Sequence, residues 1–316
     1  MELLRLEIDN AAPAASIIAP EGTMIEMLRS DHVFTEGPVW DDREDALYYT
    51  DIVGNTIEKW VPGRGGHTVM ELAGHPDGMA LDEDNRLVVA GWGARTIWRW
   101  EHDGSSKVLA AHYQGKKFNS PNDIVVKSDG SIWWTDPNGG LFNIGMCDFD
   151  IQKYLGFQGV FRVAPDGSGV TRVTDDDFEN PNGLCFSPDE SLLYVNDTPR
   201  QHIRVFDVLP DGTTAHGRLF AETKGREPGA PDGLKVDVEG NVYCTGPGGV
   251  HVFDPGGRLL CRLLMPGPPA NFGWGDPDFR GMYVTAREML YRVRLGIAGV
   301  PHGPHNRLKA LAAASS

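Results

Sequence analysis

Six acidic or amide residues occupy equivalent points of one pattern that recurs along this chain of 316 residues. Each precedes a turn and an apolar run, and they are Glu36, Asp77, Asn122, Asn182, Asp232 and Asn271. Carboxylate and carboxamide oxygens are the ligands that hard divalent cations such as Ca²⁺, Mg²⁺ and Mn²⁺ prefer. The carboxylates of Glu36 and Asp232 would balance the charge of one such cation, and Asn122 and Asn182 would add neutral oxygens.

A simpler explanation exists for any single copy of the pattern. Asp and Asn before Gly are good turn residues, because their side chains hydrogen-bond to the backbone two residues further on. The first copy differs, because Glu36 has a longer side chain that can reach inward. Burying so many polar groups together without a cation would also be costly. We therefore favour a shared cation site over six independent turns.

The spacing of the copies predicts how the fold positions these residues. They begin about 40 to 60 residues apart, a period typical of β-propeller blades. Each copy supplies two strands, a third such as TIEKW or GVFRV follows, and a more polar fourth completes most units. We predict an all-β, six-bladed β-propeller with four-stranded antiparallel blades. Equivalent residues would then ring one mouth of the central channel.

The two ends of the chain predict how the ring closes. The last unit has no good fourth strand after MLYRVRL, because residues 301–316 have the character of a tail. The segment TMIEMLRS at residues 23–30 precedes the first copy and can take that place, which removes an exposed edge. We predict one propeller domain over residues 1–316, closed by this N-terminal strand. A short N-terminal lead and the C-terminal tail would lie outside the ring.

Composition restricts the partners and the compartment. The net charge of −15 argues against nucleic acid, which requires a basic face. No run of 18 apolar residues is present, and MELLRLEIDN lacks the features of a signal peptide. Cys147, Cys185, Cys244 and Cys261 have no C-x-x-C spacing, which favours buried free thiols in a reducing compartment. We expect a cytoplasmic protein that binds neither membrane nor nucleic acid.

Four phrases resemble the gluconolactonase and senescence-marker-protein family, which includes regucalcin and luciferin-regenerating enzymes. They are FTEGPVW, FNSPNDIVVKSDGSIWWTDP, NPNGLCFSPDESLLYVNDT and APDGLKVDVEGNVYCTG, and the resemblance spans about residues 30–292. It implies a six-bladed propeller with one divalent cation at the channel mouth. By position, the implied ligands are Glu36, Asn182 and Asp232, with Asn122 as a further ligand or a substrate contact. Some members hold the sugar acid with an Arg where this chain has Ser120, so we expect a different mode of substrate binding.

The resemblance implies a metal-dependent hydrolase that opens a sugar-acid lactone. A cation polarises the lactone carbonyl and activates water, and a carboxylate accepts the proton. We expect Asp232 to be this base, with Glu36 as the alternative. Ca²⁺ is the preferred cation, and Zn²⁺, Mn²⁺, Mg²⁺ and Fe²⁺ are alternatives. No G-x-S-x-G, H-E-x-x-H or phosphate-binding glycine loop competes with this interpretation.

Several other residues are candidates for the pocket around the mouth. The longest insertion, residues 137–159, carries Phe142, Tyr154 and Phe157 and would either close over the mouth as a lid or pack on itself. We expect substrate contacts from Asn122, Ser120, His75 and Tyr154, although His75 is more readily explained as a polar surface residue. Three Asp residues that end second strands are interpreted as turn caps: Asp51, Asp136 and Asp197.

Three alternative functions stay open at this point. The same metal site would also suit another lactone, an ester or an organophosphate. A non-catalytic propeller would instead offer its face to a protein partner and would need no cation. A calcium-handling role is the least favoured, because one site with few carboxylates predicts weak affinity.

Overall fold

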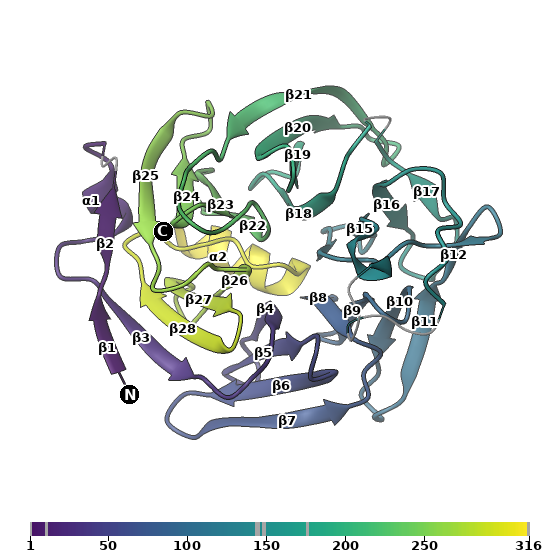
Figure 1. Cartoon of the computed structure of the whole chain (residues 1–316), viewed down its shortest axis with the longest axis horizontal. Helices are drawn as coiled ribbons and strands as arrows, with labels where there is room; N and C mark the ends of the chain where they lie inside the picture. Colours follow the sequence, from purple (N-terminus) through teal and green to yellow (C-terminus); the bar gives the residue numbers. More distant parts are fainter. Residues whose placement is uncertain (1, 10–11, 143–145, 147–149, 175–176, 315–316) are drawn as a thin grey trace.

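Six antiparallel sheets follow one another around a central axis in the computed structural model of this chain (Figure 1). The structure describes residues 2–9, 12–142, 146, 150–174 and 177–314. The predicted six-bladed propeller with four-stranded blades is confirmed. The first strand of each blade lies nearest the axis, and each following strand lies further out (Figure 1).

The first three blades contain the following strands. Blade one has β4 (Thr35–Asp41), β5 (Ala46–Asp51), β6 (Thr56–Val61) and β7 (Gly65–Glu71). Blade two has β8 (Pro76–Leu81), β9 (Leu87–Gly91), β10 (Thr96–Trp100) and β11 (Ser106–Ala110). Blade three has β14 (Ile124–Val126), β15 (Ile132–Asp136), β16 (Gly159–Val163) and β17 (Thr171–Arg172). Between blades two and three lies a hairpin of β12 (His112–Tyr113) and β13 (Lys116–Lys117), and the 3₁₀ turn η1 (Gly139–Leu141) follows β15.

The last three blades complete the ring. Blade four has β18 (Pro181–Phe186), β19 (Leu192–Asp197), β20 (His202–Val208) and β21 (Thr214–Glu222). Blade five has β22 (Leu234–Val236), β23 (Val242–Gly246), β24 (Gly249–Phe253) and β25 (Leu259–Leu264). Blade six has β26 (Asn271–Gly275), β27 (Gly281–Ala286), β28 (Met289–Arg294) and, from the N-terminal segment, β3 (Met24–Arg29).

Apolar packing between neighbouring blades forms the core. The second strands β5 and β15, which contain the apolar runs LYYT and IWWT, are buried along their whole length. One cluster joins Val125 and Trp133 of blade three to Leu184 and Phe186 of blade four. Tight polar turns join the outer strands: at the tip between β20 and β21, Gly212 adopts φ +78°, and Asp211 accepts the backbone N–H of Thr213 at 2.9 Å.

The N-terminal segment closes the ring. β3 pairs antiparallel with β28, with Met27 opposite Tyr291 and Glu26 opposite Arg292, which confirms the predicted closure. The preceding lead also joins the sheets: β1 (Glu2–Arg5) pairs with β3, and β2 (Glu7–Asp9) pairs with β25. These are fifth strands at the outer edges of blades six and five, followed by the short helix α1 (Ala15–Ile18).

The C-terminal residues form a helix that crosses the centre of the ring, a packing that we did not expect of a tail (Figure 1). This helix, α2 (Pro304–Ala314), begins with a proline, which suits a first helical position. Residues 298–307 hydrogen-bond to all six blades. The partners are Trp40 O in blade one, Leu81 N in two, Ile124 O in three, Ser187 O in four, Val236 O in five and Phe279 O in six.

Two further expectations concern the whole chain. Cys185, Cys244 and Cys261 are buried free thiols, whereas Cys147 lies outside the described residues. In the described part of the chain, no helix combines the length and the apolar character needed to span a membrane.

Candidate functional site

The structure brings the six repeat residues together where the innermost strands begin. Glu36, Asp77, Asn182 and Asn271 lie within β4, β8, β18 and β26. Asn122 and Asp232 lie two residues before β14 and β22, which begin at Ile124 and Leu234. None of the six is in a turn, so the explanation as independent turn residues is wrong. We call these six residues the acidic ring.

Close contacts between neighbouring blades order the acidic ring. A glycine follows four of its members, and a Cβ atom there would lie 2.1 to 2.6 Å from an atom of the next member. These contacts join Gly37 to Asp77, Gly78 to Asn122, Gly183 to Asp232 and Gly233 to Asn271. Between blades three and four, the Leu184 N–H donates to Asp123 Oδ2 at 3.3 Å. The repeated glycine is thus explained by close packing around the axis rather than by turn formation.

Register irregularities coincide with members of the acidic ring. The pairing of the first and second strands shifts between Glu36 and Val39 in blade one. It shifts at the equivalent points, between Pro76 and Met79 in blade two and between Pro181 and Leu184 in blade four. Bulges of this kind locally change the direction of a strand and of its side chains, and they are common beside functional sites.

Three Asp residues hold the segments that lead into the acidic ring. Asp51 accepts the backbone N–H groups of Val33 and Phe34, at 2.8 and 3.0 Å. Asp197 accepts those of Glu179 and Asn180 at 2.8 and 3.1 Å, and Asp136 accepts that of Asn119 at 2.9 Å. The interpretation of these carboxylates as backbone caps is confirmed.

The carboxylates of the acidic ring repel one another in a poorly solvated site. Burial, together with the neighbouring Asp123, raises the pKa of Glu36 to about 7. Burial and then the Glu36 carboxylate raise the pKa values of Asp77 and Asp232 well above their ordinary range. Glu36 and Asp77 are buried, whereas Asp232 is half-buried. The site has excess negative charge, and Asp232 is the least buried of its three acidic residues.

The three amides of the acidic ring differ in what their oxygens contact. Asn182 Oδ1 is buried without a hydrogen-bond partner, although Asn182 Nδ2 donates to Thr198 Oγ1 at 3.3 Å. Asn122 Nδ2 donates to Asp77 Oδ2 at 2.8 Å. Asn271 Oδ1 already accepts from Lys235 Nζ at 3.0 Å. The unpaired oxygen of Asn182 therefore fits a cation ligand better than the occupied oxygen of Asn271.

The oxygen atoms of the predicted ligands suit a hard cation, although these ligands are not a cluster of acidic, histidine or cysteine side chains alone. Among the described residues, no group of three or more His, Cys, Asp or Glu side chains is placed to hold a metal ion. The predicted set differs from such a group because it combines two carboxylates, Glu36 and Asp232, with the amides Asn122 and Asn182. Excess buried negative charge and an unpaired amide oxygen both fit a divalent cation.

Sequence reasoning missed two charged residues in the channel beside the acidic ring. Lys235 Nζ lies 3.2 Å from Asp123 Oδ2, and both side chains are almost completely buried. The signal was present in the sequence, because Lys235 interrupts the apolar innermost strand Leu234–Val236. A lysine inside so short a buried strand requires an internal acidic partner.

The predicted substrate contacts have different surroundings. Ser120 is fully buried, donates to Pro137 O at 2.5 Å and accepts from Gly140 N at 3.1 Å. His75 is half-buried, with its Nδ1 2.7 Å from Ile52 O and a left-handed backbone at φ +49°. Its ring therefore carries the proton on Nδ1, because a carbonyl oxygen can only accept.

The insertion at residues 137–159 is attached to blades two and three. The Phe157 ring packs against Phe161, and the Arg172 guanidinium lies 4.2 Å from the centroid of the Phe157 ring. Tyr154 is 39% exposed, and the Arg95 guanidinium lies 5.3 Å from the centroid of its ring. Phe142 is exposed, and residues 143–145 and 147–149, where the predicted lid would continue, lie outside the described residues.

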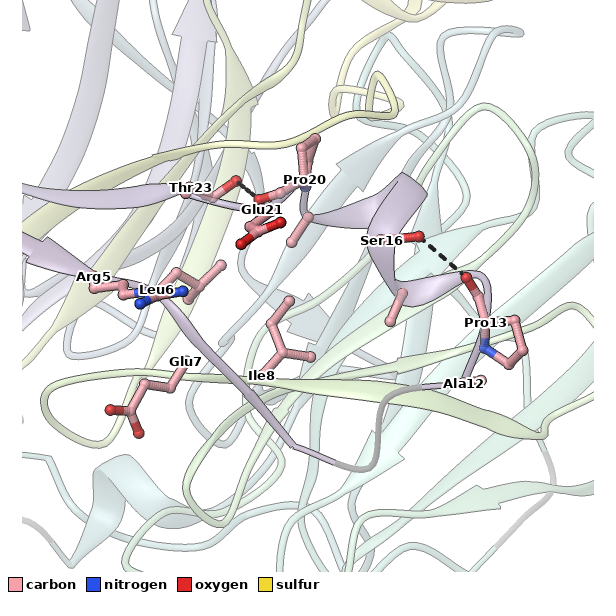
Figure 2. Close-up of a pocket in the computed structure, with 13 residues that line it drawn as sticks. Arg5, Leu6, Glu7, Ile8, Ala12, Pro13, Ser16, Pro20, Glu21 and Thr23 are labelled. Carbon is pink, nitrogen blue, oxygen red and sulfur yellow. Dashed lines mark hydrogen bonds between the residues drawn. The ribbon is translucent and has the colours of Figure 1, made fainter.

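A cleft of about 710 Å³ lies in the N-terminal segment of the chain (Figure 2). It is lined by residues between Arg5 and Thr23, from the segment that contains β2 and α1. The hydroxyl groups of Ser16 and Thr23 donate hydrogen bonds to the nearby carbonyl oxygens of Pro13 and Pro20 (Figure 2). No member of the acidic ring lines this cleft, so we do not assign the chemistry to it.

Comparison with known proteins agrees with the sequence resemblance. A family model described as the SMP-30/Gluconolactonase/LRE-like region matches residues 34–288. The gluconolactonase of Zymomonas mobilis is 30% identical over 311 residues, covering 91% of this chain and 86% of the relative. The 6-deoxy-6-sulfogluconolactonase of Pseudomonas putida is 27% identical, covering 82% and 85%. A solved gluconolactonase structure from Xanthomonas campestris has a TM-score of 0.84 and 33% identity, covering 93% of this chain and 95% of that one.

Proposed function

This chain belongs to the SMP-30/gluconolactonase/LRE-like family and is a lactonase, and we propose that it opens a sugar-acid lactone with the help of one divalent cation. The observation that carries this proposal is the acidic ring. There, the carboxylate of the half-buried Asp232 lies with the buried carboxylate of Glu36 and the unpaired oxygen of Asn182.

Four residues would hold the cation: Glu36, Asn182, Asp232 and Asn122. When bound, a divalent cation acts as a Lewis acid toward the lactone carbonyl and toward water. Ca²⁺ is our preferred choice, because all four ligands offer oxygen. Asn122 Nδ2 donates to Asp77 Oδ2, and this hydrogen bond orients the amide. The amide oxygen of Asn122 is therefore available to the cation or to substrate.

Asp232 is the proposed general base. Its backbone is held on both sides, because its N–H donates to Thr245 Oγ1 at 2.8 Å and its carbonyl accepts from Asn196 Nδ2 at 2.6 Å. The attacking water forms a bond to the carbonyl carbon and gives its proton to Asp232. When the ring C–O bond breaks, Asp232 returns that proton to the leaving oxygen. Glu36 is less suitable, because it is buried and its Oε2 already accepts the Gly37 N–H at 2.8 Å.

The substrate would enter at the mouth near His75 and Tyr154. Nε2 of His75 would be the hydrogen-bond acceptor of its ring, and Tyr154 would present the edge of an aromatic ring held on Arg95. The hydroxyl of Ser120 is engaged by Pro137 and Gly140, so we propose that it fixes η1 and shapes the mouth rather than donating to substrate. The buried free thiols are consistent with a cytoplasmic location, which we include in the proposal.

A second candidate substrate is a less polar lactone or ester, or an organophosphate. Ser120, which the resemblance places where some family members hold the sugar acid with an Arg, is buried in this chain. Phe142, in the insertion, has an exposed ring. Both observations favour a substrate with fewer charged groups at this side of the mouth.

The test is proton release from a panel of aldonolactones, apolar lactones and organophosphates. The enzyme is first chelated, and Ca²⁺, Mn²⁺, Mg²⁺ or Zn²⁺ is then added back. We expect cation-restored turnover of a sugar lactone and a loss of about 10²- to 10⁴-fold in kcat for Asp232→Asn. The matched control is Asp237→Asn, which changes a buried carboxylate of the same blade outside the acidic ring. Turnover that survives chelation, or an equal loss in both variants, would contradict the proposal.

A further inference from the structure

Lys235 lies inside the channel and connects three blades. It belongs to β22 of blade five, and only 4% of its side chain is exposed. Its Nζ lies 3.2 Å from Asp123 Oδ2 of blade three and 3.0 Å from Asn271 Oδ1 of blade six. A buried ammonium group is stable only with partners of this kind, because removing it from water is costly.

The contact with Asn271 fixes the orientation of an amide in the acidic ring. An ammonium group can only donate hydrogen bonds, so the atom of Asn271 that faces Lys235 must be its oxygen. The amide nitrogen then faces away from Lys235, and the Asn271 side chain stabilises the Glu36 carboxylate. Lys235 thereby acts on Glu36 through Asn271.

The contact with Asp123 fixes the boundary between blades three and four. Asp123 follows Asn122, and its Oδ2 also accepts the backbone N–H of Leu184 at 3.3 Å. Leu184 is two residues from Asn182, the ring member with the unpaired oxygen. One proposed amide ligand, Asn122, is therefore adjacent in sequence to Asp123, and the other, Asn182, lies two residues before the Leu184 N–H that Asp123 accepts.

Lys235 supplies a positive charge to a part of the channel that is rich in carboxylates. Four carboxylates interact with one another there: Glu36, Asp77, Asp123 and Asp232. A divalent cation compensates two of these charges, and Lys235 supplies a third positive charge from within the fold.

We propose that Lys235 is the internal counter-ion of Asp123 and of the neighbouring acidic ring, and a positioning residue for Glu36 and the amide ligands. The inference rests on the proposed cation site. Before the cation binds, Lys235 is the positive charge that holds the carboxylates together. Without it, the empty ring is destabilised by repulsion, and a bound cation relieves more of that repulsion than it does in the wild type.

The test compares the melting temperatures of wild type, Lys235→Met and the double variant Asp123→Asn/Lys235→Met, each with chelator and with saturating Ca²⁺. Methionine has a similar length and no charge. We expect Lys235→Met to melt lower in chelator and Ca²⁺ to raise its Tm by roughly 4 °C more than that of wild type. The double variant removes the paired charges together, so it should regain most of the loss in chelator.

The outcomes separate this inference from the proposed function. An increase with Ca²⁺ that is equal or smaller in Lys235→Met, when wild type responds, overturns the role of Lys235 alone. Absence of any Tm response in wild type with Ca²⁺, Mn²⁺ or Mg²⁺ overturns the cation site and this inference with it. If Lys235→Met does not fold, a folded double variant supports the proposal and an unfolded one contradicts it.

Discussion

Asn122 Nδ2 donates a hydrogen bond to Asp77 Oδ2 at 2.8 Å across the boundary between blades two and three. Both residues belong to the acidic ring, and both are buried. The direction of this hydrogen bond gives the two residues different roles. Asp77 uses one oxygen to orient the amide of Asn122, whose own oxygen is left to face the cation or substrate.

We expect Asp77→Ala to weaken divalent-cation binding by about 10- to 100-fold, because a partner that orients a ligand typically contributes that much. Asp77→Asn is the matched variant, since its amide oxygen can still accept from Asn122. It should bind the cation within a few-fold of wild type. Calorimetric titration with Ca²⁺ measures both values. Equal losses in the two variants would mean that the charge of Asp77, rather than its orientation of Asn122, governs binding.

The repeat pattern was sufficient to predict the blades, because propeller strands obey rules that act locally. Second strands packed between two sheets must be apolar on both faces, and outer strands end in tight polar turns. The same reasoning identified β3 as the closing strand and the convergence of Glu36, Asn182 and Asp232. Their chemical roles are still proposals.

Two features were out of reach of pattern reasoning because they depend on contacts between distant segments. α2 docks through polar groups on backbone carbonyls, such as Asn306 on Trp40 O, and its apolar contacts come from Ala310 and Leu311, which are too few to reveal the docking in the sequence. The lysine inside β22 was visible in the sequence, but the identity of its acidic partner was not, because only the folded ring places Asp123 of blade three opposite Lys235. The glycines after the acidic ring resembled turn signals, whereas their function is to let neighbouring blades approach.

Gly233 offers a test of that close approach. A Cβ at this position would lie 2.3 Å from Asn271 Oδ1, so Gly233→Ala must displace Asn271 or the strand that carries it. We expect a loss of about 1 to 3 kcal/mol in the free energy of unfolding and a roughly tenfold lower kcat. The control is Gly267→Ala, where no atom lies within 4 Å of the added Cβ. Denaturant unfolding and lactone hydrolysis measure the two effects, and indistinguishable results for the two variants would contradict the packing argument.

The buried carboxyl group of Asp136 should make the stability of the folded chain fall as the pH rises. Burial raises its pKa to about 7 in the folded chain, from an ordinary value near 3.8. The folded state therefore binds this proton more tightly than the unfolded state does. The contribution of Asp136 to stability is fully present below about pH 4 and is lost as the pH rises toward 7, on the order of 4 kcal/mol at most.

Replacing Asp136 by Asn removes this titration but keeps an oxygen that can accept the Asn119 N–H. We expect the Tm of Asp136→Asn, measured relative to wild type, to rise steadily between pH 4 and pH 7 and to level off above. Thermal unfolding at half-unit pH intervals would detect the difference. Parallel curves for the two proteins would show that Asp136 titrates at the same pH in the folded and unfolded states.

The C-terminal helix should contribute to stability through one buried side chain rather than through its exposed charges. The Arg307 guanidinium, on α2, donates to the carbonyl oxygens of Ser187 and Pro188 and pairs with Glu190 at 3.3 Å. Arg307→Met leaves these acceptors without that donor, so we expect a loss of roughly 2 to 4 kcal/mol in the free energy of unfolding. Lys309 lies on the same helix and pairs with Asp42 at 2.8 Å, but about half of its side chain is exposed.

Lys309→Met is therefore the matched control, and it should change the free energy of unfolding by less than about 0.5 kcal/mol. Urea unfolding followed by tryptophan fluorescence reports on both variants, because Trp40 and Trp274 are buried in the core. If α2 only covers the end of the channel, the two variants will be equally stable. If it holds the six blades together, as the contacts of residues 298–307 indicate, Arg307→Met will unfold at clearly lower urea and Lys309→Met will follow wild type.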